Sequence, residues 1–465
     1  MNTTRRRFLG QANCALVSSL PILNTLLNLR LTSSVAAASG SATGYKALVC
    51  IFLNGGNDSF NMLAPRGAAH AEYAAIRSDL ALPEAQLLPI TPLNDAGRPL
   101  GVHPGMPELR NLFEAGKAAF VANVGTLVEP VTKAQFLAGT GNLPLGLFSH
   151  SDQIEQWQTS VPDKREGVGW GGRMADLLKS LNPQDKVSMN ISLTGSNVFQ
   201  AGHTVAEYAI REDGAVPLNG YNRNWVADQN VLNARSAGID SQMAVEYDNL
   251  FQRTYNTKRR EAVEAYDVFT TATQNALPPA VAATFPATPL GQQLEMVART
   301  IAGRGALDVC RQTFFMNYGG WDHHSETLPQ QAAMLPVVSQ AVGAFHAALV
   351  SLGAENDVTL FLASDFGRTL TSNGRGSDHA WGGNVFVTGG AVKGRRIYGQ
   401  YPDLYQSGPL DVGRGRFLPT TAVDLYFAEM ALWMGVPKAD LPLVLPNIGR
   451  FHSVQSSDAP LGFLL

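Results

Sequence analysis

Five short apolar runs recur along the chain, and each breaks into glycine or polar residues. The first, YKALVCIFLNGGNDSFN, begins at Tyr45 and breaks at Gly55 and Gly56 before Asp58. Apolar runs of this length that are bounded by turn residues are typical of buried strands. The other runs occupy residues 117–125, 306–320, 357–368 and 383–394. The pattern therefore predicts buried strands in these five places.

Helical patterns separate several of these runs. Apolar residues recur at helical spacing in residues 107–116, 289–303 and 329–353, which precede the second, third and fourth runs. Strands that alternate with helices favour an α/β fold with a mostly parallel sheet and helices on both faces. Such sheets bind ligands beyond the carboxyl ends of their strands, so we expect a functional site there.

Two stretches depart from the alternation. Residues 126–170 are loop-rich, and a later stretch carries apolar residues at helical spacing, namely Met243, Tyr247, Leu250, Phe251 and Tyr255. We expect this aromatic stripe to pack within the protein rather than to bind a cofactor. The stretch predicts a helical cap at about residues 205–280, inserted in one large α/β domain that spans residues 39–465.

The first 38 residues have the features of an export signal. Three arginines precede Phe8 and Leu9, an apolar stretch follows, and small residues lie at Ala36 to Ala38. This order predicts a twin-arginine signal peptide, with a basic helix retained in a cytoplasmic protein as the alternative. The rest of the chain is then expected in the periplasm or otherwise exported, and no later segment resembles a transmembrane anchor.

Charge argues against nucleic acid as a partner. The whole chain has a formal net charge of -3, and residues 1–38 contain four arginines and no acidic residue, so their removal would leave -7. An acidic surface repels phosphate backbones. The hydrophobic fraction of 45% is that of an ordinary globular protein with a large core.

Acids and histidines gather at the predicted strand ends. The candidates are Asp58, Asp322, His323 or His324, Asp365, Asp378 and His379, with His150 in the loop-rich insertion. Divalent cations are bound by carboxylate and neutral imidazole groups together. The pattern therefore predicts a divalent metal, which we leave open as Zn, Mn, Mg or Ca, held by Asp322, His324, Asp365 and His379 with Asp58 near it.

Spacing distinguishes the two adjacent histidines. Asp322 and His324 are two residues apart and would point the same way from an extended segment, whereas His323 would face the other side. We therefore expect His324 to be the ligand. Arg173 and Arg368 are candidates for binding an oxyanion, because a guanidinium matches phosphate oxygens with two hydrogen bonds, although surface ion pairs are the alternative role.

Motifs in the predicted signal peptide and along the whole predicted mature chain resemble those of the exported family called domain of unknown function 1501, which is related to the alkaline phosphatase and sulfatase superfamily. The matching stretches, in order, are TRRRFL, FLNGGNDSFNMLAPR, HPGMPELRNLFEAGK, FSHSDQIEQWQT, GVGWGGRMAD, GGWDHH, ASDFGRT, SDHAWGGNVFVTGGAVKG and PTTAVDLYFAEMALWMGV. The resemblance implies an alkaline-phosphatase-like fold. It also implies two-metal phosphoryl or sulfuryl transfer to a serine or threonine nucleophile at a helix N-terminus.

Carried over in superfamily order, the resemblance implies Asp58 first, then Ser149 or Ser151 as nucleophile with Ser59 as a further alternative. Asp322 with His324, then Asp365, and finally His379 would follow as metal ligands. Arg368 would contact the oxyanion. The substrate would be a small-molecule or polymer ester of phosphate or a related acid.

This sequence departs from the superfamily pattern in ways that weaken a two-metal site. The Asp-to-His spacing is shortened to Asp322 and His324, Phe366 stands where the second pair has histidine, and Asn54 stands where the first acid is expected. The C/S-x-P-x-R signature of sulfatases is approached only by SVPDK, so a sulfatase of that type is disfavoured. The sequence thus leaves two hypotheses: a metal-dependent ester hydrolase, and a non-catalytic exported binding or assembly protein that retains the fold and one metal.

Overall fold

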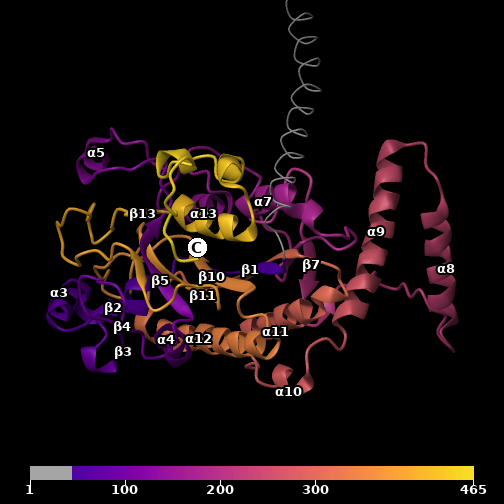
Figure 1. Cartoon of the computed structure of the whole chain (residues 1–465), viewed down its shortest axis with the longest axis horizontal. Coiled ribbons are helices and arrows are strands. Elements are labelled where there is room, and N and C mark those ends of the chain that lie inside the picture. Colours follow the sequence, from indigo (N-terminus) through magenta and orange to yellow (C-terminus); the bar gives the residue numbers. More distant parts are fainter. Residues whose placement is uncertain (1–43, 465) are drawn as a thin grey trace, which may run out of the picture.

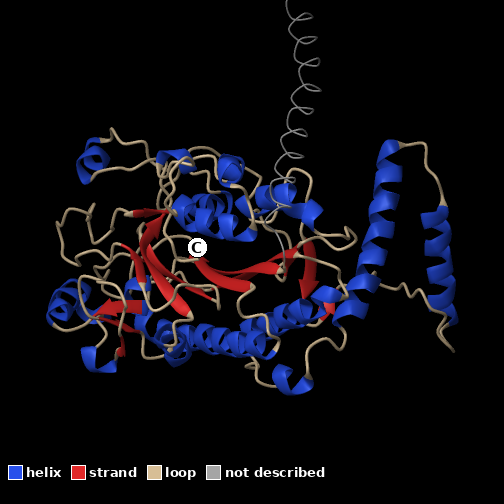
Figure 2. Cartoon of the chain, viewed as in Figure 1, coloured by secondary structure: helices blue, strands red, loops and turns tan. Residues whose placement is uncertain are grey.

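A ten-stranded, mostly parallel sheet forms the centre of the protein (Figures 1 and 2), in a computed structural model that describes residues 44–464. The strand order is β12-β5-β11-β10-β1-β9-β6-β7-β8, with β13 paired to β5. The strands are β1 (Lys46–Asn54), β5 (Ala118–Gly125), β6 (Asn190–Ser192), β7 (Tyr208–Arg211), β8 (Gly214–Ala215), β9 (Arg311–Gly319), β10 (Val358–Ser364), β11 (Gly383–Thr388), β12 (Ile397–Gly399) and β13 (Thr421–Ala422). β11 and β8 pair with their neighbours in antiparallel fashion. The prediction of a mostly parallel sheet is confirmed.

Helices cover both faces of this sheet (Figure 2). The α-helices are α2 (Ser59–Met62), α3 (Ala68–Arg77), α4 (Pro107–Glu114), α5 (Lys133–Ala138), α6 (His150–Thr159), α7 (Trp170–Leu178), α8 (Asn230–Ala244), α9 (Leu250–Thr273), α10 (Pro279–Ala282), α11 (Pro289–Ala302), α12 (Thr327–Ser351), α13 (Val423–Met434) and α14 (Leu441–Val444). Figure 1 shows α7 and α13 on one face, and α4, α11 and α12 on the other. This layered arrangement is the one expected for a parallel sheet buried on both sides.

Shorter elements complete the chain. Within residues 44–464, six 3-10 helices occur at η1 (Ser78–Leu80), η2 (Glu84–Gln86), η3 (Lys179–Leu181), η4 (Gly303–Gly305), η5 (Lys438–Asp440) and η6 (Ile448–Arg450). A separate antiparallel sheet of three strands has the order β2 (Leu63–Pro65), β4 (Leu100–Val102) and β3 (Leu88–Ile90). It lies beside α3 and α4 in Figure 1.

Three central strands end level with one another, and this sets the position of the candidate site. β1 lies between β9 and β10, with Asn54 opposite Gly319 and Leu53 opposite Ser364. The loops that follow the three strands therefore emerge at the same edge of the sheet. The predicted acids and histidines lie in or near these loops.

α12 is long and apolar enough to cross a membrane by length and composition. Half of its most apolar window is buried within the protein, and the helix contacts α4 and α11. These contacts are those of a core helix in the layer below the sheet. Among residues 44–464, α12 is the one helix that meets this length and composition test.

Residues 205–280 contain the strands β7 and β8 and the helices α8 and α9, and the aromatic stripe of this stretch is not packed. α8 and α9 form a hairpin that stands beside the rest of the protein, next to the β8 end of the sheet (Figure 1). Met243 is buried, whereas Leu250, Phe251 and Tyr255 are 61%, 83% and 70% exposed. The expectation that the stripe packs inside the protein is therefore wrong, because residues between α8 and α9 turn the chain and leave the start of α9 in solvent. The predicted signal peptide lies outside the described residues.

Candidate metal centre

The loops that follow β1, β9 and β10 contact one another closely at the carboxyl ends of these strands. The backbone N–H of Gly55 donates to both carboxylate oxygens of Asp365, at 3.0 and 3.2 Å. Gly55 has φ +123°, and a Cβ at this position would lie 2.4 Å from the backbone nitrogen of Asp322. A residue with a side chain would force the loops apart, so glycine is required where they meet.

His150 begins α6 and is held by Asp365. Its Nδ1 donates to Oδ2 of Asp365 at 2.7 Å, which leaves Nε2 directed at Oδ1 of Asp322, 3.4 Å away. The hydrogen bond to Asp365 raises the pKa of His150 above its usual value, against the effect of burial. Within the described residues, the buried Nε2 atom has no hydrogen-bond partner. His150 thus presents an unpaired nitrogen to Asp322.

His379 is fixed in the same way by the backbone. Its Nδ1 donates to the carbonyl oxygen of Phe148 at 2.7 Å, and its Nε2 lies 3.4 Å from Oδ1 of Asp322. Because a carbonyl oxygen can only accept, the proton of neutral His379 must be on Nδ1. Burial, aided by the charge of His150, holds the pKa of His379 below its usual value.

His324 completes the cluster from the loop after β9. Its Nδ1 contacts Oδ1 of Asp378 at 3.1 Å, and its Nε2 lies 3.1 Å from Oδ1 of Asp322 and 2.9 Å from Nε2 of His379. Asp378 also accepts hydrogen bonds from Asn373 and Arg414. Although burial opposes ionisation, these bonds lower the pKa of Asp378 to about 2, so its carboxylate is available to orient His324.

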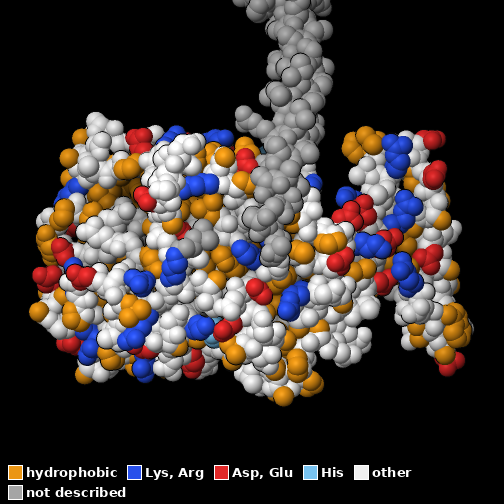
Figure 3. Space-filling model, viewed as in Figure 1, with side chains coloured by type: hydrophobic (Ala, Val, Ile, Leu, Met, Phe, Trp, Pro, Cys, Tyr) orange, Lys and Arg blue, Asp and Glu red, His pale blue; other side chains and the backbone are white. Residues whose placement is uncertain are grey.

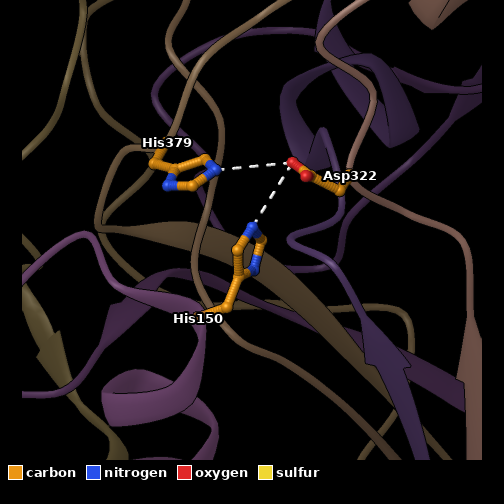
Figure 4. A group of neighbouring side chains, drawn as sticks. All are labelled: His150, Asp322 and His379. Atoms are coloured by element: carbon orange, nitrogen blue, oxygen red, sulfur yellow. Dashed lines mark ion pairs between the residues drawn. The ribbon is translucent and has the colours of Figure 1, made fainter.

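The three imidazoles converge on one carboxylate oxygen (Figure 4 shows His150, Asp322 and His379). His150, Asp322 and His379 each offer one ligand atom, and these three atoms lie within 4.8 Å of one another. With every Nδ1 occupied by an acceptor, each neutral ring turns an Nε2 lone pair toward the carboxylate. Lone pairs and a carboxylate repel one another unless a proton or a cation lies between them. The donor set of three imidazoles and one carboxylate fits a divalent metal ion. The Nδ1 atoms contact carboxylate or backbone carbonyl oxygens, as they do in histidines that bind a metal through Nε2.

Phe366 packs against two of these rings. Its centroid lies 4.9 Å from that of His150 and 4.8 Å from that of His379. Phe366 is 2% exposed, so an apolar ring occupies the position where the superfamily resemblance led us to look for a second histidine. The structure therefore offers one compact donor cluster here and no imidazole from residue 366 for a second ion.

Asp58 occupies a different environment from the one predicted. Both its side chain and that of Arg77 are fully buried, and the two form an ion pair. Ser377 Oγ lies 3.5 Å from the same carboxylate oxygen. The prediction of Asp58 as a near ligand is corrected, because its charge is already neutralised by an arginine. Asp365 is likewise corrected from a metal ligand to a residue that positions His150. Its carboxylate accepts the hydrogen bond from Nδ1 of His150 and contacts the cluster through that ring.

Arg368 is enclosed rather than exposed to a substrate. Its side chain is 0% exposed and donates to Oδ1 of Asp322 at 2.7 Å, to the carbonyl of Gly55 at 3.1 Å and to the backbone and hydroxyl oxygens of Ser377. Burial opposes ionisation of Asp322, but the hydrogen bond and charge of Arg368 outweigh it and lower the pKa of Asp322. The expected oxyanion contact is thus corrected to a residue that positions Asp322.

The other predicted oxyanion residue, Arg173, lies elsewhere. It is buried in α7 and donates to the backbone oxygens of Val444, Val168 and Thr159. These bonds join α7 to the C-terminal ends of α6 and α14 and to the loop before α7. Arg173 therefore has a structural role in the contacts that the structure describes.

The candidate nucleophiles differ in their surroundings. Ser149 is the N-cap residue of α6, directly before His150, and its Oγ lies 3.1 Å from Oγ of Ser151. Ser59 is buried and its Oγ accepts the backbone N–H of Asn384. Ser149 and Ser151 are consequently the serines at the same helix N-terminus as a member of the cluster.

Sequence patterns identified part of this site. Asp322, His324 and His379 follow predicted strands and lie in the cluster, whereas His323 is buried with its pKa lowered by burial. The sequence offers His150 as a further candidate outside the predicted ligand set, because it lies in the loop-rich insertion and has no strand-end signal. Its place two residues after the apolar LGLF stretch gives no hint that its ring reaches Asp365.

Comparison with known proteins gives a family. A family model described as "Protein of unknown function (DUF1501)" matches residues 45–412. The chain belongs to the DUF1501 family. All residues of the cluster fall within the DUF1501 match, whereas Arg414, which pairs with Asp378, lies just beyond it. No curated protein matches the sequence.

Several solved structures are similar at low levels. A 2-O GAG sulfatase matches with 9% identity and a TM-score of 0.27, covering 77% of this chain and 68% of that one. A mutant alkaline phosphatase matches with 12% identity and a TM-score of 0.23, covering 71% and 64%. The soluble domain of lipooligosaccharide phosphoethanolamine transferase A from Neisseria meningitidis matches with 10% identity and a TM-score of 0.25, covering 87% and 94%. With TM-scores this low, the matches establish no shared activity.

Proposed function

We propose that this protein is an exported, metal-dependent hydrolase of the alkaline phosphatase superfamily type that acts on a phosphate or related ester. The observation that carries the proposal is the convergence of three histidine Nε2 atoms on Oδ1 of Asp322. His150, His324, His379 and Asp322 would hold the metal. Three nitrogens and one oxygen favour a borderline ion such as Zn over Mg or Ca.

The charge of the centre favours an anionic ligand. Asp322, Asp365 and Asp378 carry three negative charges, and Arg368 and Arg414 carry two positive ones, so neutral imidazoles and a dication would leave one net positive charge. When bound, the dication would polarise a phosphoryl or related oxygen and offset charge on the leaving oxygen. Ester phosphates are complementary to such a site, whereas neutral substrates gain less.

A second function is supported by a specific observation. Arg368 is fully buried, and no oxyanion clamp is left among the arginines that the sequence suggested. A non-catalytic exported protein that retains the fold and one metal would account for this. The two functions differ in turnover but share the metal.

Elemental analysis and turnover separate these functions. We expect a single dication per wild-type chain, and loss of both metal and aryl phosphate hydrolysis, by at least about 100-fold, in His150→Ala, His379→Ala and Asp322→Ala. His203→Ala is the matched control, because His203 is exposed and its backbone rather than its ring bonds to Asp176. Metal-free wild-type protein prepared without chelator would reject the centre. Metal without turnover of any ester would favour the binding function.

A further inference from the structure

The α8–α9 hairpin contains a hollow of about 430 Å³. Residues 216–224, which lead toward α8, form one wall of it, and residues 259–267 of α9 form the other. None of the residues proposed to hold the metal lines this hollow. Pockets that bind small molecules commonly have volumes of about 300–1,000 Å³, so the hollow is large enough to hold one. We call it the hairpin pocket.

Contacts on both sides hold the 216–224 wall in place. The hydroxyl group of Tyr221 donates to Oδ1 of Asp240 in α8 at 2.7 Å. Arg223 forms an ion pair with Asp267 of α9 at 2.6 Å. The wall is therefore fixed to both helices of the hairpin. A pocket whose walls are already positioned loses little conformational entropy when a ligand binds.

The inner surface of the hairpin pocket is mostly apolar. Its lining includes Val216, Leu218, Tyr221, Ala262, Val263 and Tyr266. Val263 belongs to the small buried cluster between α8 and α9, and Leu218 and Tyr221 pack against that cluster. The pocket thus borders the core of the hairpin but is open to solvent. An apolar ligand that displaces water from such a surface gains free energy in proportion to the area that it covers.

Arg259 gives the hairpin pocket a positive charge that no ion pair neutralises. The other charged residues of the lining, Arg223 and Asp267, pair with each other. Within residues 44–464, the partly buried Arg259 forms no ion pair, and its one side-chain hydrogen bond is to Oε1 of Gln242 at 3.4 Å. Basic and acidic side chains are interspersed on the face of the hairpin that Figure 3 shows. The preference for a negative group is therefore local to Arg259.

We propose that the hairpin pocket binds a small organic acid that has an aromatic body and one negatively charged group. The body contacts Tyr221, Tyr266 and Val263, because aromatic rings pack favourably against tyrosine as well as covering apolar surface. The acidic group accepts hydrogen bonds from the guanidinium of Arg259. A neutral ligand would leave that guanidinium without a partner, and further charges on the ligand would be buried against apolar lining. This site does not rest on the proposed metal-dependent activity.

Fluorescence titration of the full-length protein with two matched probes tests the proposal. Anilinonaphthalene sulfonate has an aromatic body and one negative charge, whereas phenylnaphthylamine has the same rings without the charge. We expect wild type to bind the sulfonate probe. Arg259→Gln should weaken that binding by about 10-fold or more and leave the neutral probe unchanged, because only the charged group bonds to Arg259. Arg260→Gln is the matched control, since Arg260 is exposed and does not line the pocket, and it should change neither titration.

A filled pocket separates this site from other apolar surfaces of the protein. Ala262→Trp places an indole ring in the hairpin pocket, so the folded variant, checked by far-ultraviolet circular dichroism, should lose the site for both probes. The proposal is overturned if wild type does not bind the sulfonate probe, or if Arg259→Gln affects the two probes equally. Wild-type binding of the sulfonate probe by folded Ala262→Trp would also overturn it. If Ala262→Trp does not fold, the comparison of Arg259→Gln with Arg260→Gln still decides.

Discussion

Asp58 and Arg77 form an ion pair from which solvent is excluded. Both side chains are 0% exposed, and Arg77 also donates to the backbone oxygen of Thr369 at 3.1 Å. The pair joins the loop after β1 to α3 and to the loop after β10. In such a pair each charge is tolerated only because the other is present.

Replacing Asp58 by asparagine should therefore destabilise the fold without removing metal. The variant leaves the charge of Arg77 buried and unpaired, and we expect the free energy of unfolding to fall by about 3–5 kcal/mol in urea titrations. Folded Asp58→Asn should bind as much dication as wild type, whereas Asp322→Asn should bind less. Equal loss of metal in the two variants would restore Asp58 as a ligand.

The role of a residue could be predicted only where the sequence around it determines where its side chain points. The positions of Asp322 and His324 follow from the apolar run that ends just before them, and His379 lies between two predicted strands. The roles of Asp365 and Arg368 depend on contacts with His150, Gly55 and other residues that are far apart in sequence. Burial of a charged residue is a tertiary property, so sequence spacing suggested ligand and oxyanion roles that the packed structure does not allow.

At the scale of elements, long and apolar segments were predictable and short or exposed ones were not. The five predicted strands correspond to β1, β5, β9, β10 and β11. β2, β3 and β4 have three residues each, too few to show an alternating pattern. The break between α8 and α9 carries neither glycine nor proline in residues 245–249, and its one local signal is Asn249, whose side chain caps the start of α9.

Helix α13 carries a carboxyl group that is buried in the protein, where its charged form is disfavoured. Asp424 lies in its first turn and is 0% exposed. Burial raises the pKa of Asp424 to about 7, against the nearby charges of Arg173 and Arg450. The folded protein therefore binds a proton at Asp424 in a pH range where the unfolded chain has released it.

This shift gives a pH-dependent stability with a definite sign. Because the folded pKa exceeds the unfolded one, stability falls as pH rises from about 4 to 7, and the loss is complete above that range. We expect Asp424→Asn to gain about 4 kcal/mol in unfolding free energy relative to wild type between pH 4 and pH 8, as measured by urea denaturation. The exposed Asp213→Asn should show no such trend. A constant difference between Asp424→Asn and wild type would disprove the shift.

At the scale of the whole molecule, an ion in the candidate metal centre would cross-link distant segments. His150 comes from α6, Asp322 and His324 follow β9, and His379 precedes β11. An ion that binds these residues binds the folded chain and not the unfolded one. Binding free energy then adds directly to folding stability.

Removing the metal should accordingly lower thermal stability. At free metal about 1,000-fold above its dissociation constant, the bound ion contributes about 4 kcal/mol, which chelation with EDTA would remove. We expect the unfolding temperature of wild type to fall with EDTA and to recover with added zinc. His379→Ala should respond to neither treatment. If the unfolding temperature of wild type stayed the same after EDTA treatment and after zinc was added back, the result would contradict the metal centre.

The position of β1 in the sheet has a consequence for synthesis of the chain. β1 is translated before the other strands that the structure describes, yet its partners are β9 and β10, and Lys46 pairs with Arg311. At about 5–20 residues per second, the ribosome needs on the order of 10 to 50 s to travel between those two residues. During that interval the most central strand of the fold has no native neighbour. The nascent protein must therefore keep an apolar segment from pairing elsewhere until most of the polypeptide has been made.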